Sequence, residues 1–122
     1  MSFAKISYIT VDSVDPDALA PFWAGVLGVQ VEDRIEDGEY VLLGRTGEGI
    51  PGLAFQRVPE AKSGKVRIHL DLGVEDLDDA TGRIEELGGR WLEPGITRRV
   101  GGYAWRCMAD PEGNEFDIAS NA

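Results

Sequence analysis

Few side chains of this chain are suited to catalysis or metal binding, because it contains one histidine and one cysteine. His69 lies in the alternating segment 67–72, where Arg67, His69 and Asp71 share one face and apolar residues take the other. A histidine beside an aspartate predicts a hydrogen-bonded or proton-transfer pair in preference to a metal ligand. Cys107 is predicted as a small, structurally buried residue on a strand, and alone it excludes an internal disulfide.

The elements that must position these residues repeat within the chain. The second half of the 122 residues follows the first at a constant offset of 61. A fixed register of this kind is typical of a duplicated supersecondary unit. We therefore expect one domain over 1–122, with pseudo-repeat modules 1–60 and 66–122. The offset aligns helix starts, helix ends and closing strands: Asp15 with Asp76, Asp17 with Asp78, Gly28 with Gly89, Gly52 with Gly113 and Phe55 with Phe116.

Each module is predicted to contain a strand, a helix and three shorter strands. Asp15-Pro16-Asp17 is a good helix opening, and Gly28 a good helix end. This order of elements predicts an α+β fold of two tandem βαβββ modules, with Trp23 and Trp91 used for packing. The predicted extended segments are 6–13, 29–35, 39–44 and 52–57 in the first module, and 67–72, 90–93, 102–108 and 115–119 in the second.

Composition and charge narrow the classes of partner. No apolar run approaches the roughly 20 residues of a membrane span, and no signal peptide precedes the first strand pattern, so we expect a cytoplasmic protein without a membrane partner. The formal net charge of −10, from 12 basic and 22 acidic residues, disfavours nucleic acid. The same charge favours a cationic ligand, although it also serves solubility alone.

Three segments carry a resemblance to a known superfamily. DPDALAPFWAGVLG, RIHLDLGVEDLDDA and DPEGNEFDIA, set in tandem modules, resemble the vicinal oxygen chelate superfamily. That superfamily includes glyoxalase I, bleomycin resistance proteins, extradiol dioxygenases and methylmalonyl-CoA epimerases, and the chain is most similar to small bacterial glyoxalase-like proteins. The resemblance spans essentially the whole chain, and it implies a cup-shaped mixed sheet, the glyoxalase/bleomycin resistance fold, and a homodimer.

The resemblance also implies positions for a divalent metal, on the first and last strands of each module. By motif these positions are Tyr8, His69, Gln56 and Asp117, and the 61-residue offset pairs them. Tyrosine keeps its proton near neutrality and glutamine is a weak neutral donor, so we favour no metal. The alternative is a Mg, Mn, Ni or Zn site of His69, Gln56 and Asp117. The single histidine argues against the iron site of extradiol dioxygenases.

Metal-free relatives provide the favoured functional interpretation. Bleomycin resistance proteins sequester a cationic, aromatic drug, and the acidic chain offers Tyr40, Tyr103 and Trp105 for stacking and cation–π contacts. We expect the cup to bind a small organic molecule, aromatic or cationic, as a resistance- or sequestration-type binder. Its polar lining is predicted to comprise Tyr8, Thr10, Gln56, His69, Asp71 and Asp117.

Two kinds of enzyme remain as alternatives. One is a divalent-metal-dependent lyase or isomerase of glyoxalase I or epimerase type. Asp117 takes the position where those enzymes have a glutamate, and it is one methylene shorter. The other is a metal-free acid–base enzyme in which His69 and Asp117 transfer protons.

Overall fold

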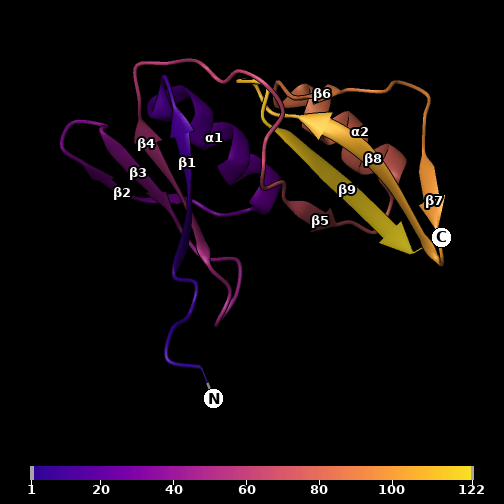
Figure 1. Cartoon of the computed structure of the whole chain (residues 1–122), viewed down its shortest axis with the longest axis horizontal. Helices are drawn as coiled ribbons and strands as arrows, with labels where there is room; N and C mark the ends of the chain where they lie inside the picture. Colours follow the sequence, from indigo (N-terminus) through magenta and orange to yellow (C-terminus); the bar gives the residue numbers. More distant parts are fainter. Residues whose placement is uncertain (1, 122) are drawn as a thin grey trace. The chain divides into compact units, whose positions relative to one another are not determined.

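The computed structural model describes residues 2–121 and consists of two compact units, Met1–Ala61 and Lys62–Ala122 (Figure 1). We call these the first and the second module. Their two helices and two mixed, open sheets give the α+β fold that the sequence predicted. No helix within the described residues has the length and apolar character needed to cross a membrane.

The first module forms a four-stranded sheet of order β1-β4-β3-β2, in which β1 and β4 run parallel. The three predicted strands after the helix are confirmed, each within two residues of its expected ends. The elements are β1 (Tyr8–Ser13), α1 (Pro16–Leu27), β2 (Val31–Ile35), β3 (Tyr40–Leu43) and β4 (Gly52–Arg57).

Both ends of α1 follow from local sequence. The side chain of Asp15 accepts a hydrogen bond from the Ala18 N–H at 3.3 Å, which caps the first turn. The helix ends at Gly28, whose φ of 68° is left-handed and therefore favours glycine. Trp23 is buried and meets Phe22 edge to face, which confirms its predicted packing role.

The second module forms a sheet of order β5-β9-β8-β6, and β7 pairs with the remaining part of β8 (Figure 1). Asp76 caps its helix by accepting a hydrogen bond from the Asp79 N–H at 3.0 Å. The elements are β5 (Asp71–Gly73), α2 (Leu77–Glu86), β6 (Arg90–Trp91), β7 (Arg98–Val100), β8 (Tyr103–Ala109) and β9 (Glu115–Asn121).

Two predictions for the second module are wrong. The segment 67–72 is a strand only from Asp71 onward, because the ladder with β9 begins at the hydrogen bond from the Asp117 N–H to the Leu70 carbonyl. Ile68, expected on the apolar face, is 81% exposed. The second module also has a fourth strand after its helix within the described residues, where three were predicted, because Arg98–Val100 forms β7, which folds back on β8 through the Gly101-Gly102 turn.

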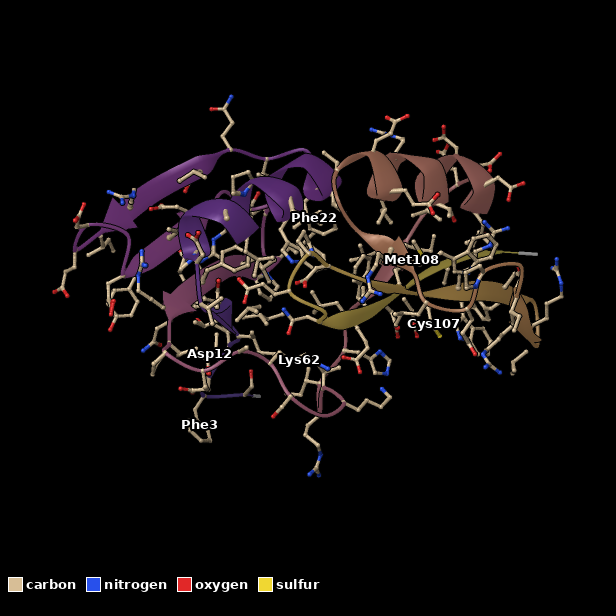
Figure 2. The ribbon with its side chains drawn as sticks, turned by 90° about the horizontal axis from the view of Figure 1, so that it is seen from above. Phe3, Asp12, Phe22, Lys62, Cys107 and Met108 are labelled. Atoms are coloured by element: carbon tan, nitrogen blue, oxygen red, sulfur yellow. The ribbon has the colours of Figure 1, made fainter. Side chains whose placement is uncertain are left out.

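The core of each module lies where its helix contacts its sheet. Phe55 of β4 and Phe116 of β9, which correspond under the offset, are 0% and 1% exposed. In β8, Met108 is fully buried while its neighbour Cys107 points to the opposite side of the strand (Figure 2). The second-module sheet therefore has one face toward α2 and another face free to form a site.

Candidate functional site

The open face of the second-module sheet collects the side chains with chemical potential. Trp105 and Cys107 lie on this face because they alternate with the buried Met108 along β8. Asp117 of β9 lies directly opposite Cys107 in the antiparallel ladder. Asp71 of β5 lies directly opposite Asp117 in the parallel ladder. Three strands thus bring acidic, aromatic and thiol groups onto one surface.

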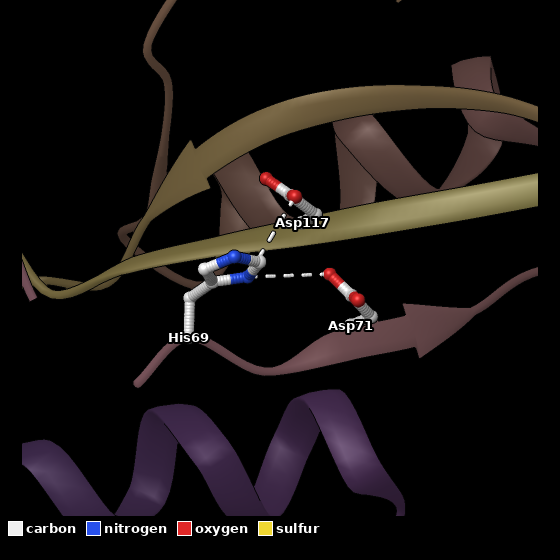
Figure 3. Close-up of side chains that lie close together, drawn as sticks. All are labelled: His69, Asp71 and Asp117. Atoms are coloured by element: carbon white, nitrogen blue, oxygen red, sulfur yellow. Dashed lines mark ion pairs between the residues drawn. The ribbon is translucent and has the colours of Figure 1, made fainter. Parts of the chain in front are cut away.

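His69, Asp71 and Asp117 converge into one cluster on this face (Figure 3). The Nδ1 atom of His69 lies 3.3 Å from Oδ1 of Asp71 and 3.8 Å from Oδ2 of Asp117. The imidazole is thus in contact with the carboxylate of Asp71, from its own segment. It also lies close enough to the carboxylate of Asp117, on the neighbouring strand, for electrostatic attraction when it is protonated. The side chains of His69 and Asp71 are 44% and 67% exposed, whereas that of Asp117 is 21% exposed.

The environment shifts the acid strength of two groups at the cluster. Burial raises the pKa of the Asp117 carboxyl, and the nearby Asp71 adds to the shift, while the Cys107 thiol and the His69 imidazole oppose it. Burial, with the charges of Asp117 and Glu93, raises the pKa of the Cys107 thiol to about 11. Because a thiol with a raised pKa stays protonated near neutral pH, Cys107 is poorly suited to nucleophilic attack.

The cluster forms part of a cavity of about 880 Å³ whose lining residues all belong to the second module. Tyr103 and Trp105 contribute aromatic rings, and Glu75 adds a third carboxylate to those of Asp71 and Asp117. Neither lysine nor arginine lines this cavity in the described part of the chain. Glu75 was not predicted from the sequence; it lies two residues after the end of β5 at Gly73.

The other predicted site residues lie in the first module. Tyr8 of β1 pairs with Gly52, and the Arg45 guanidinium lies 4.9 Å from the centre of the Tyr8 ring. Thr10 pairs with Ala54 of β4.

Gln56 and Tyr40 also lie together in the first module. Gln56 pairs with Asp12 on one side and with Tyr40 of β3 on the other. The structure therefore groups His69, Asp71, Asp117, Tyr103 and Trp105 in one cavity, and it assigns Tyr8, Thr10, Gln56 and Tyr40 to the first-module sheet.

The cluster fits a divalent ion. Imidazole nitrogen and carboxylate oxygen bind such ions at about 2.0–2.2 Å, so two ligands of one ion lie at most about 4.4 Å apart. The candidate ligand atoms of His69, Asp71 and Asp117 all lie within 4.8 Å of one another, which small side-chain rotations reduce to the required spacing. An ion held there would supply Lewis-acid polarisation of a ligand oxygen.

Comparison with known families matches residues 8–119 to the family described as "Glyoxalase-like domain". Members of the vicinal oxygen chelate superfamily, with which this match is consistent, often use divalent metals. Comparison with curated proteins found no match.

Solved structures share the fold over nearly the whole chain. A glyoxalase/bleomycin resistance protein/dioxygenase family enzyme from Burkholderia phytofirmans PsJN has a TM-score of 0.78 at 17% identity, covering 98% of this chain and 100% of that one. A glyoxalase-related enzyme from Fulvimarina pelagi has a TM-score of 0.73 at 23% identity, with coverage of 96% and 88%. A genomically encoded fosfomycin resistance protein from Listeria monocytogenes has a TM-score of 0.76 at 15% identity, with coverage of 99% and 96%.

Proposed function

We propose, from the premise that the chain belongs to the glyoxalase-like domain family of the vicinal oxygen chelate superfamily, that its second-module cavity binds a small organic cation bearing an aromatic ring. The protein would act as a resistance- or sequestration-type binder that needs no catalytic metal. One observation carries the proposal: the described lining residues of the cavity combine three carboxylates and two aromatic rings and include no lysine or arginine. The expected homodimer belongs to the same proposal, and light scattering of the purified chain tests it.

The acidic part of the cavity provides the electrostatic half of the recognition. A cation within about 4 Å of a carboxylate gains roughly 1 kcal/mol in a water-like medium and about 4 kcal/mol near a protein surface. Asp117 should contribute most, because its side chain is 21% exposed and is therefore less screened than that of Asp71 at 67%. An anionic ligand would meet repulsion from the same groups.

The aromatic part of the cavity lies two residues along β8 and β9 from the acidic part. Trp105 pairs with Ala119, two residues beyond the pairing of Cys107 with Asp117. Two residues along a strand span about 7 Å, so the ring of Trp105 and the carboxylate of Asp117 suit a ligand whose ring and cation are separated by a short linker. The small Ala119 side chain leaves room for the ligand ring beside Trp105.

Calorimetry with three matched probes tests the proposal. The chain should bind 2-phenylethylammonium, bind the neutral 2-phenylethanol more weakly, and fail to bind 3-phenylpropionate. Trp105→Leu should weaken binding of the ammonium probe by about 5- to 30-fold, since a cation–π contact contributes about 1–2 kcal/mol. Tyr40→Leu is the control, because Tyr40 lies in β3 of the first module. Equal affinity for the three probes, or equal losses in both variants, would contradict the proposal.

The cluster of His69, Asp71 and Asp117 favours a second candidate, the metal-dependent lyase or isomerase. In that reaction the ion would stabilise developing negative charge, and His69 or Asp117 would move the proton. Elemental analysis of protein purified without chelator, followed by titration with nickel, manganese or zinc, tests this candidate. A protein that takes up no stoichiometric ion excludes it.

The metal-free acid–base enzyme rests on the 3.8 Å approach of His69 Nδ1 to Asp117 Oδ2. His69→Ala separates this enzyme from a binder. A binder should keep much of its affinity for the ammonium probe, because its carboxylates and rings remain, whereas an acid–base enzyme should lose turnover.

A further inference from the structure

We infer that residues 2–7, the segment that precedes β1, dock into the second-module cavity of a second copy of the chain and compete there with the organic cation. We call this segment the arm. The inference rests on the proposed function, because the arm carries the two groups that the cavity is proposed to recognise, an aromatic ring on Phe3 and an ammonium group on Lys5. The protein thus contains its own competitor for the cavity.

The arm is held to the first-module sheet at Ser7. The Ser7 carbonyl accepts hydrogen bonds from the Gly52 N–H at 3.0 Å and from Nη1 of Arg45 at 2.8 Å. Residues 2–6 are all exposed, and no hydrogen bond or ion pair joins them to any other described residue. Phe3 is fully exposed and projects from the ribbon into solvent (Figure 2). A large ring with no partner in its own copy marks the arm as a contact segment for another molecule.

The spacing of the two arm groups matches the spacing of the cavity groups. In an extended segment, side chains two residues apart lie on the same side at a separation of about 7 Å, so an extended arm presents Phe3 and Lys5 together. The cavity has the same interval, because Trp105 lies two residues from the pairing position of Asp117 along β8 and β9. The arm therefore places the Phe3 ring beside Trp105 when the Lys5 ammonium lies at Asp117.

The arm and the cavity are also complementary in charge and polarity. Lys5 is the only charged residue of the arm, whereas the described lining residues of the cavity include three carboxylates and no lysine or arginine. Leu72 and Val74 add apolar side chains to the lining, and Tyr103, which is 61% exposed, presents a second uncovered ring. The net charge of −10 makes two copies repel each other, so a positively charged arm supplies attraction at the point of contact.

Docking of the arm makes ligand binding depend on protein concentration. When each copy places its arm in the cavity of the other, the two copies form a closed symmetric pair in which both cavities are filled. An arm that fills about nine cavities in ten lowers the apparent affinity for the organic cation about tenfold. The cavity is thus closed in concentrated, ligand-free protein, and the organic cation opens it by displacing the arm.

Photo-crosslinking of the full chain tests the docking directly. A benzophenone amino acid replaces Phe3, and heavy-isotope-labelled and unlabelled protein are mixed before irradiation. Mass spectrometry should find arm peptides of one isotope joined to peptides of the other isotope that contain Trp105 or residues 71–75. Cross-links only within one copy, or none in the cavity, would overturn the inference. Lys5→Glu should lower the yield about fivefold, whereas Lys65→Glu, the same change at an exposed lysine outside the arm, should leave it unchanged.

Calorimetry with 2-phenylethylammonium separates this inference from the proposed function. The affinity of the unmodified chain for the amine should fall as protein concentration rises, whereas Lys5→Glu should bind the amine with constant affinity, up to about tenfold tighter at high concentration. Amine binding with the same affinity at every concentration in both proteins keeps the proposed function and rejects the arm. Cross-links in the cavity without any amine binding keep the docked arm and reject the binder of small organic cations.

Discussion

Both modules begin with a strand and a helix and close with a strand parallel to the first, but within the described residues the second has the additional strand β7, and the two pair their parallel strands in different registers. In the first module Gln56 lies opposite Asp12. In the second module the residue that corresponds to Gln56, Asp117, lies opposite Asp71, which corresponds to Thr10 under the 61-residue offset. The closing strand is thus displaced by two residues relative to its opening strand. A shift by two keeps every side chain on its face and changes its neighbours.

This register difference accounts for the cluster. With the first module's register, Asp117 would lie opposite Gly73, and four residues of strand, about 13 Å, would separate that position from His69. The observed register brings His69 Nδ1 to 3.8 Å from Asp117 Oδ2. The corresponding position in the first module is used for packing, since Tyr8 lies against Gly52. The site therefore depends on strand pairing as much as on residue type.

The largest expected effect is a loss of stability, and it tests the helix–sheet core that both modules contain. Phe55→Ala and Phe116→Ala should each lower the free energy of unfolding by about 3–5 kcal/mol, because both rings are fully buried beneath a helix. Chemical denaturation followed by circular dichroism measures the loss. Phe→Leu at the same positions, expected to cost about 1–2 kcal/mol, keeps the comparison measurable if the alanine variants do not fold. A difference above about 2 kcal/mol between the two alanine variants would show that the modules do not share an equivalent core.

The shared scaffold is the part that the sequence predicted well. Asp15 and Asp76 are both observed as helix caps, as the opening pattern indicated. Phe55 and Phe116 are both buried, as their shared offset suggests. These features depend on local chemistry and on hydrophobic burial, which a sequence displays directly.

The site could not be predicted to the same extent. The 61-residue offset compares positions along the chain, whereas the site depends on which residues of neighbouring strands lie opposite each other. If both modules had the same register, Asp117 would lie opposite Gly73 and not opposite Asp71. Nothing in the sequence indicated that the second module pairs its strands with a shift of two residues. The short β5 shows the same limitation: the alternation of 67–72 indicates a strand, but a strand forms only where β9 supplies hydrogen-bond partners. Glu75 was missed because it lies outside any periodic segment.

Substitution of two glycines that correspond under the offset should have a smaller effect on stability, with a different physical cause in each module. Gly52→Ala should cost about 1–2 kcal/mol, because an added Cβ would lie 2.8 Å from Cε1 of the Tyr8 ring. Gly113→Ala should cost a similar 1–2 kcal/mol for another reason: its φ of 87° is left-handed, although an added Cβ would lie at an ordinary contact distance of 4.0 Å from Cδ of Lys62. Thermal and denaturant unfolding measure both losses.

Two second substitutions separate these causes. In a Tyr8→Ala background the cost of Gly52→Ala should nearly vanish, while the cost of Gly113→Ala should persist. Gly113→Asn should recover part of the loss at that position, since asparagine tolerates left-handed backbone. If Tyr8→Ala rescues neither variant or rescues both, the proposed difference between the packed first-module face and the strained second-module turn is wrong.

The smallest expected effect concerns the aspartates at the first turns of the two helices. Asp17 accepts hydrogen bonds from Arg34 at 2.9 and 2.8 Å, whereas its counterpart Asp78 pairs with Arg106 at 2.6 Å through one nitrogen. The two hydrogen bonds from Arg34 hold the pKa of the Asp17 carboxyl below its ordinary value of 3.8. Because the folded-state pKa is depressed, the pair stabilises the first module above about pH 4, and this contribution is lost as pH falls through the folded-state pKa.

A carboxyl titration by nuclear magnetic resonance measures this shift directly. Arg34→Ala should return the Asp17 pKa toward its ordinary value. Arg34→Lys keeps the charge but loses the paired hydrogen bonds, and it should return most of the shift as well, since hydrogen bonding outweighs the Coulombic attraction. A shift that survives in Arg34→Lys would mean that charge alone acts on Asp17, and the two-point contact would then not distinguish it from Asp78. The change in unfolding free energy should be small, because both side chains of the pair are more than 40% exposed.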